Sequence, residues 1–231
     1  MKKTAIIVMT ITVLSKVLGF GREIAISYVY GASTITDAYL ISDTIPSVIF
    51  SFISAGIVMG FIPLYSRIIN ESGQSEANRY TSNLSNLLLL LATVIVLLVQ
   101  IFAGKIVKIF AIGFSGETLV LATRFTRIGV LGVYFTILIN VFANYLRING
   151  NYVIPESIGF VKNTLIIIFV FVSAQTNIYI LAIGGVVASL GQLLLLLPFV
   201  RKTGYRYQPV LSLKDEYIKT MVIIALPVIA G

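Results

Sequence analysis

Long stretches without any charged residue constrain this chain more than any other feature. The run from Asn163 to Val200 contains 38 residues and no Asp, Glu, Lys or Arg. As a single helix it would extend roughly 57 Å, almost twice the thickness of the hydrocarbon core of a bilayer. The polar letters SAQTN at 173–177 interrupt it. They therefore predict a tight turn between two membrane spans, at about 153–174 and 178–200.

Four other apolar runs have the length of a membrane span, which needs about 20 mostly apolar residues. They lie at 5–30, 44–66, 80–104 and 128–146. The first is a span only if the charges inside it are tolerated, and the second extends back to about Ala38. A last apolar run begins near 220 and ends at Gly231. We therefore expect the sequence to be a fragment or the product of a truncated reading frame.

The whole pattern predicts an all-α fold, a polytopic membrane helix bundle of six transmembrane helices plus the start of a seventh. We expect a six-helix lobe over 1–203, a cytoplasmic linker over 204–219 and the beginning of the seventh helix over 220–231. Composition supports a membrane protein, because only 11% of the residues are charged, whereas soluble domains have about 25%.

Several kinds of chemistry are excluded by composition. The chain has no Cys, His or Trp, which rules out disulfides, Cys/His metal sites, thiol nucleophiles and histidine triads. No paired carboxylates, phosphate-binding glycine loop or metal-ligand spacing is present either. We expect no enzyme activity, no metal and no cofactor. The net charge of +8 does not indicate nucleic acid, because basic residues flank the spans as membrane insertion requires.

The distribution of Lys and Arg predicts a cytoplasmic N-terminus. With six spans, ten basic residues fall on the cytoplasmic side: Lys2, Lys3, Arg67, Arg79, Arg147, Arg201, Lys202, Arg206, Lys214 and Lys219. The opposite side holds Lys105 and Lys108, joined by Arg124 and Arg127 if the fourth span starts late.

Charges gather unexpectedly in the first predicted hairpin. Lys16, Arg22, Glu23 and Asp37 lie within or beside apolar segments, although a charge at the bilayer centre costs about 2.5 to 3.5 kcal/mol. Lys16 and Glu23 share nearly one helical face, and Arg22 points elsewhere.

Two interpretations of this hairpin remain open from the residues alone. Lys16 to Glu23 either extend toward an interfacial region while Asp37 caps the second helix, or they form a polar site within the membrane. Asp43 is one further acid that reaches into the membrane, either facing a cavity or interface or coupling protons.

These charges belong to a longer series of short sequence motifs. Its members are Ser15-Lys16, Leu18-Gly19-Phe20, Arg22-Glu23, Tyr30-Gly31-Ala32, Thr36-Asp37-Ala38-Tyr39, Pro46 and Phe61-Ile62-Pro63, followed by LRINGNYVIPESIGFVKN ending at Asn163. From Ser15 to Asn163 the chain resembles the N-terminal part of the MurJ (MviN) lipid II flippases, which belong to the multidrug/oligosaccharidyl-lipid/polysaccharide exporter superfamily.

This resemblance implies a flippase of the bacterial cytoplasmic (inner) membrane that moves lipid II, the lipid-linked peptidoglycan precursor, by alternating access. A cationic central cavity would receive the diphosphate and sugars while the lipid tail stays among the membrane lipids. By position, Lys16 and Arg22 match bases of that cavity and Asp37 matches an acid that pairs with an arginine. Glu23 and Asn163 are accessory candidates.

The chain also departs from the family pattern. Phe50 stands where the family has an arginine, and Ala55 stands where it has an acid. The family's C-terminal lobe is missing too, so we expect transport to need that lobe or a second copy. Three alternatives therefore remain: a flippase for another undecaprenyl-linked oligosaccharide, a cation-coupled drug antiporter using Asp37 and Asp43, and a non-transporting membrane scaffold.

Overall fold

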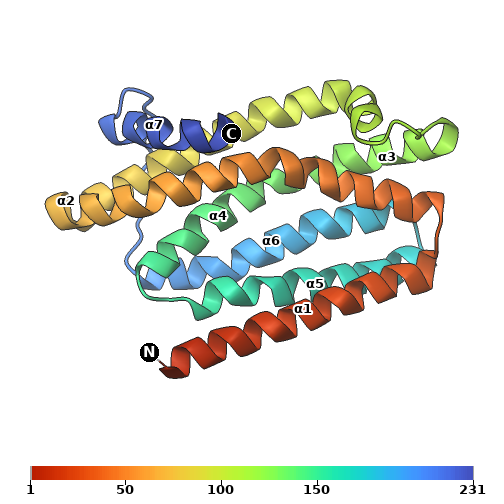
Figure 1. Ribbon diagram of the computed structural model, residues 1–231, viewed down its shortest axis with the longest axis horizontal. Coiled ribbons are helices and arrows are strands. Elements are labelled where there is room, and N and C mark those ends of the chain that lie inside the picture. Colours follow the sequence, from red (N-terminus) through yellow and green to blue (C-terminus); the bar gives the residue numbers. More distant parts are fainter. Residues whose placement is uncertain (1, 231) are drawn as a thin grey trace.

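Helices form almost the entire chain in the computed structural model, which describes the backbone of residues 2–230 and the side chains of residues 3–225. The described residues contain no strand. In chain order the elements are α1 (Lys2–Tyr30), α2 (Thr34–Phe110), α3 (Gly116–Gly129), the 3-10 turn η1 (Val130–Gly132), α4 (Val133–Ile148), α5 (Val153–Gln175), α6 (Tyr179–Lys202) and α7 (Glu216–Ala230) (Figure 1).

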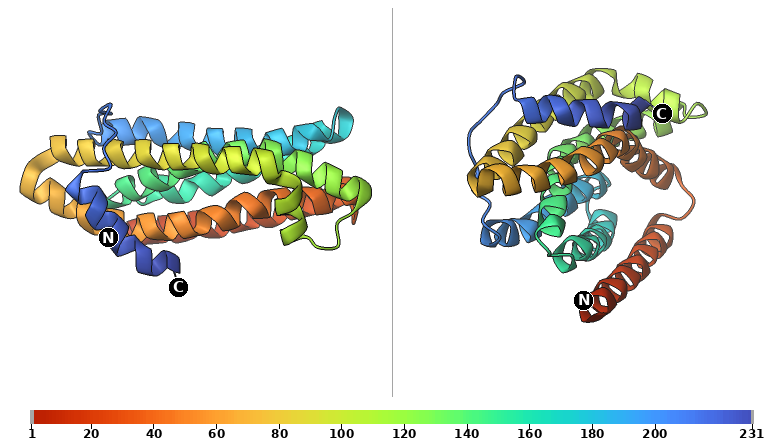
Figure 2. Two further views of the ribbon diagram at one scale, coloured as in Figure 1. Left: turned by 90° about the horizontal axis from the view of Figure 1, so that it is seen from above. Right: turned by 60° about the vertical axis from the view of Figure 1, so that its left-hand side comes forward.

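Gly73 divides α2 into two antiparallel arms. Its backbone has φ 80° and ψ −178°, a conformation that is open to glycine and strained for other residues. Figures 1 and 2 show the first arm, residues 34–72, running to this bend and the second arm, residues 74–110, returning beside it. The polar segment between the two predicted spans is therefore helical on both sides of one glycine instead of forming a loop.

In the part of the chain that the structure describes, five helices have the length and hydropathy of membrane spans, with α3 to α4 taken as one continuous element over Gly116–Ile148. Because α2 is one of the five and runs in both directions, the bundle has six crossings. The predicted all-α membrane bundle is confirmed. The boundaries differ: the fourth crossing starts at Gly116, so Arg124 and Arg127 lie within a helix, and α7 begins at Glu216, before the predicted residue 220.

Small residues bring α1 and α5 close together. A Cβ atom added to Gly159 of α5 would overlap the Ser15 hydroxyl of α1, and one added to Gly19 would lie 3.4 Å from Asn163 Nδ2. That amide group donates to the Ser15 carbonyl at 3.1 Å. Figure 2 shows α1 beside α5 and set apart from most of α2.

Buried aromatic side chains pack together near the C-terminal end of α6. Tyr65, Tyr145 and Tyr205 are buried and pack edge to face, with ring centroids 5.4 to 5.7 Å apart. The Tyr205 hydroxyl lies 2.9 Å from Ser82 Oγ. Burial raises the pKa of Tyr205, which keeps this hydroxyl protonated for that hydrogen bond.

Residues 203–215, which we call the connector, join α6 to α7 along the second arm of α2. Polar side chains at 78, 82, 83 and 86 share one face of that arm and bind connector backbone. Asn83 Nδ2 donates to the Ser212 carbonyl at 3.0 Å and its Oδ1 accepts from Ser212 N at 2.8 Å. Asn78 and Asn86 donate to Gly204 O and Val210 O, and Gln208 N donates to Ser82.

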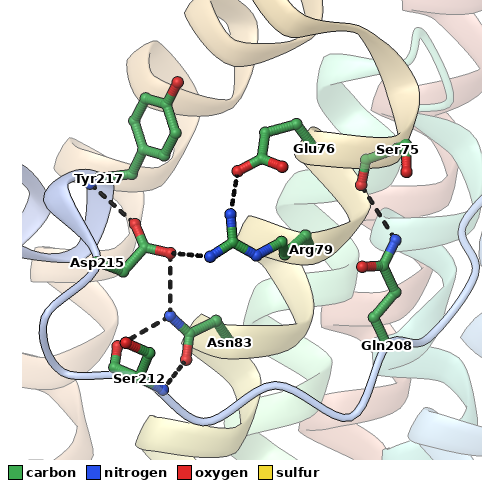
Figure 3. A network of polar contacts seen from close by, with 8 residues as sticks. All are labelled: Ser75, Glu76, Arg79, Asn83, Gln208, Ser212, Asp215 and Tyr217. Atoms are coloured by element: carbon green, nitrogen blue, oxygen red, sulfur yellow. Dashed lines mark hydrogen bonds and ion pairs between the residues drawn. The ribbon is translucent and has the colours of Figure 1, made fainter.

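An ionic network closes the same region (Figure 3). Asp215 accepts from Tyr217 N at 3.0 Å and so caps the start of α7, and it lies 3.7 Å from Arg79. Arg79 also pairs with Glu76 at 2.6 Å. We call the contacts of residues 75–86 with the connector, including Asp215 at its end, the connector clamp. It determines where α7 begins against α2.

Candidate functional site

A polar cavity of about 250 Å³ lies between the first arm of α2, η1 with α4, α5 and α6. Its wall contains hydroxyls and two charged groups: Tyr39, Ser42, Asp43, Ser47, Ser51, Ser54, Thr136, Lys162 and Ser189. The α2 members recur at helical spacing and so form one polar face of the first arm. Polar groups inside a membrane bundle normally face water or a ligand, which makes this cavity the candidate site.

The hydroxyl groups of the wall are oriented as acceptors. Ser42, Ser47 and Ser51 each donate to a carbonyl of their own helix at 2.7 Å, and Thr136 and Ser189 do so at 3.1 Å. A carbonyl oxygen can only accept, so each hydroxyl has used its proton and retains lone pairs. The wall is therefore suited to a ligand that donates hydrogen bonds.

Asp43 and Lys162 are the charged residues of the wall. Asp43 is exposed on α2, and Lys162 is half-buried near the middle of α5. Among the residues that the structure describes, no ion pair joins Lys162 to a carboxylate. Lys162 was not among the site residues predicted from the sequence. The available signal was one lysine immediately before the longest charge-free run.

Arg22 lies on α1 at the edge of this region. Its side chain is 23% exposed and pairs with Glu23, and Tyr39 and Asp43 are near enough to act on it electrostatically. Its Nε atom is buried without a hydrogen-bond partner in the described part of the chain. A half-buried guanidinium with a spare donor can bind an anion.

Lys16 and Asn163 lie at the contact between α1 and α5. Lys16 is exposed, and the carbonyl of the preceding residue, Ser15, accepts the hydrogen bond of Asn163. Asn163 is buried and fixes the two helices to each other. Since Lys162 precedes Asn163, this contact places Lys16 and Lys162 at one level of the bundle, on neighbouring helices.

Asp37 lies in the first turn of α2, just after the short turn that joins α1 to α2. The interpretation of Asp37 as a helix cap is wrong, because Ser33 caps α2 and accepts from Thr36 N at 3.4 Å. The structure does not bring Asp37 and Arg22 together: Glu23 is the ion-pair partner of Arg22, and within residues 3–225 Asp37 forms no ion pair. In that part of the chain no group of three Asp or Glu residues is placed for a metal ion either.

Charged side chains beside a polar cavity in a multipass helical bundle are typical of membrane transport proteins. The family model described as "Lipid II flippase MurJ" matches residues 26–231. This match covers most of the sequence, so the chain belongs to the MurJ family.

Similar proteins from several bacteria carry the same description. The "Probable lipid II flippase MurJ" of Buchnera aphidicola subsp. Baizongia pistaciae is 29% identical over 234 residues, covering 97% of this chain and 46% of that protein. The "Lipid II flippase MurJ" of Thermosipho africanus is 28% identical over 180 residues, covering 78% of this chain and 37% of that protein. The chain thus spans less than half the length of these relatives.

Solved structures share the fold. A lipid II flippase MurJ in an inward closed conformation has a TM-score of 0.80 at 23% identity, covering 97% of this chain and 47% of that chain. A MOP superfamily transporter from Pyrococcus furiosus has a TM-score of 0.75 at 17% identity, covering 99% of this chain and 52% of that chain. At these identities the likeness extends to the arrangement of helices.

Proposed function

We propose that this chain forms one bundle of a flippase that moves lipid II across the bacterial cytoplasmic membrane by alternating access. The observation that carries the proposal is the half-buried Arg22, with an unsatisfied Nε, beside a polar cavity in a chain of the MurJ family. We take lipid II as the substrate because relatives are described as lipid II flippases.

In this function the headgroup enters the polar region while the lipid tail remains among the membrane lipids. Arg22 and Lys16 bind the diphosphate, Arg22 with its planar fork and Lys16 as a point charge. Glu23 holds Arg22 while the site is empty and is exchanged for the phosphate oxygens. Asp37 acts as a counter-charge near the outer end, and Asn163 holds α1 at the distance from α5 that presents Lys16.

The proposed orientation has the N-terminus in the cytoplasm. The start of α1, the bend of α2, the α4–α5 turn and the connector lie at one end of the bundle (Figure 1), and the ten basic residues counted for the cytoplasmic side lie in or close to those segments. An excess of Lys and Arg marks the cytoplasmic side of a membrane protein.

Alternating access requires a second bundle that moves against this one. The relatives are more than twice as long as the region they share with this chain. We infer that the partner bundle consists of further helices of the same polypeptide or of a second copy.

The test expresses the gene that encodes this chain in a bacterium depleted of its own lipid II flippase. Wild-type should restore growth, Arg22→Ala should fail, and Arg22→Lys should restore growth in part because it keeps the charge and loses the fork. Arg67→Ala is the matched control, since Arg67 forms an exposed pair with Glu71 at the bend. Equal growth with wild-type and Arg22→Ala, at equal protein levels, would reject the site.

One observation favours a second candidate within the same class. Phe50 is buried and lines the cavity at the position of the expected arginine, which alters the charge offered to the headgroup. A gene that fails to replace the lipid II flippase but restores export of another undecaprenyl-linked oligosaccharide would establish this alternative.

A further inference from the structure

We propose that Lys162 is a substrate-binding cation of the cavity and takes a diphosphate oxygen of the lipid-linked headgroup. The inference rests on the proposed flippase function and adds a residue from α5 to the bases of α1. It explains how the cavity attracts an anion although Phe50 occupies the position of a base.

Lys162 is in the right place for this role. It lines the same cavity as Phe50, and the two come from different helices, α5 and α2. The neighbouring residue Asn163 faces α1 and is fixed there by its bond to Ser15. Consecutive residues of a helix point about 100° apart, so this bond directs Lys162 away from the α1 contact.

The surroundings of Lys162 suit a bound anion better than a structural role. Lys162 is half-buried as a residue, and within residues 3–225 it has no ion-pair partner. A partly buried charge without a partner destabilises a membrane bundle. Such a residue contributes to the protein when a ligand brings the opposite charge.

The rest of the wall supplies complementary contacts. Asp43 and the hydroxyls of Ser42, Ser47 and Thr136 are acceptors, since those hydroxyls donate to their own helices. Sugar hydroxyls and amide groups are donors to such a wall. A headgroup with an anionic diphosphate and neutral sugars therefore matches one cation placed among several acceptors.

Binding of farnesyl diphosphate to the purified protein in detergent, with farnesol as the uncharged control, tests the proposal. Wild-type should prefer the diphosphate. Lys162→Met, similar in length and without charge, should weaken diphosphate binding by about tenfold or more, the usual effect of losing a charge-assisted contact. Lys162→Arg should stay within about threefold of wild-type. The matched control Lys108→Met removes an exposed lysine of α2 outside the cavity.

Thermal unfolding separates binding from structural support. Lys162→Met should unfold at the wild-type temperature or above it, because it removes an unpaired charge. Loss of binding with a lower unfolding temperature in both Lys162→Met and Lys162→Arg would show a structural lysine and overturn the proposal. Wild-type affinity in Lys162→Met, or a wild-type protein that binds the diphosphate no better than farnesol, would also overturn it.

A double variant that moves the positive side chain from α5 to α2 gives a second test. The Phe50→Arg and Lys162→Met double variant should recover diphosphate binding, because the cation returns to the same cavity from α2. A double variant that unfolds at the wild-type temperature and still fails to bind would contradict the proposed replacement.

The growth assay distinguishes this inference from the proposed function. If the gene does not replace a lipid II flippase while diphosphate binding depends on Lys162, the proposed function fails and the inference stands. If the gene restores growth and Lys162→Met restores it equally well at equal protein levels, the inference alone fails.

Discussion

The connector clamp and the polar cavity differ in whether their polar groups have partners within the protein. In the clamp, Asn83 and Asp215 each have several partners within hydrogen-bonding or ion-pair distance. In the cavity and at its edge, among the described residues, Lys162 has no ion-pair partner and Arg22 keeps a buried Nε without an acceptor. The clamp thus satisfies its polar groups within the protein, whereas the cavity and its edge keep groups that are available to a ligand.

The energies explain the division. A satisfied hydrogen bond contributes about 0.5 to 1.5 kcal/mol, and a buried group that loses its partner costs about 1 to 3 kcal/mol. Substitutions in the clamp should therefore lower stability, and substitutions in the cavity should lower binding and leave stability unchanged or higher. The following predictions test that separation, beginning with the largest expected loss of stability.

Asn83→Ala should cause the largest loss. Asn83 satisfies both the N–H and the carbonyl of Ser212 and also reaches Asp215 at 3.3 Å, so its removal leaves two backbone groups unpaired in a part-buried segment. We expect a decrease of about 2 to 3 kcal/mol in the free energy of unfolding. Circular dichroism during unfolding in detergent micelles measures it.

Asn70→Ala is the control for that substitution, because Asn70 is an exposed asparagine of the same helix, near the bend. It should unfold like wild-type. If Asn83→Ala were also unchanged, the hydrogen bonds to the connector would not hold α7 against α2, and the contrast with the cavity would lose its structural half.

Two adjacent glycines of α6 sharpen the same contrast. A Cβ on Gly184 would lie 2.6 Å from Phe169 Cγ on α5, whereas a Cβ on Gly185 meets nothing within 4 Å and points into the cavity region that Gly185 lines. Gly184→Ala should destabilise the protein by about 1 to 3 kcal/mol through overpacking. Gly185→Ala should leave stability at or slightly above wild-type, because alanine favours a helix.

When ligand binding is measured, the larger effect should come from Gly185→Ala instead of Gly184→Ala. Gly185→Ala narrows the cavity and should weaken farnesyl diphosphate binding, while the Gly184→Ala protein that remains folded should bind as wild-type does. Equal unfolding temperatures for the two variants would contradict the helix packing described for α5 and α6.

The sequence predicted the crossings because the length of apolar runs determines what can span a bilayer. It did not show that the polar segment around Gly73 would remain helical, since exposed polar residues are compatible with both helix and loop. The partner of Arg22 was also missed. Neighbouring residues of a helix do not normally face each other, which made Asp37 a better candidate than Glu23.

Lys162 and the clamp show a second limit of sequence reasoning. A lysine inside an apolar run could face lipid, an interface or a cavity, and only the packing of α5 decides between them. The asparagines and serine at 78, 82, 83 and 86 recur at helical spacing, which predicts one polar face. The occupant of that face, a segment more than 100 residues later, depends on the tertiary fold.

The smallest expected effect concerns two arginines of α2. Arg79 lies 3.7 Å from Asp215, whose side chain is 4% exposed, whereas Arg67 and Glu71 are 64% and 53% exposed. Since solvent screens exposed pairs, Arg67→Met should change the free energy of unfolding by less than about 0.5 kcal/mol. Arg79→Met should cost about 1 kcal/mol, because it leaves the buried Asp215 carboxylate without its cation. High salt should reduce the small Arg67 effect and leave most of the Arg79 effect. Equal losses for the two variants at low salt would mean that Asp215 is held by Asn83 and the α7 backbone alone.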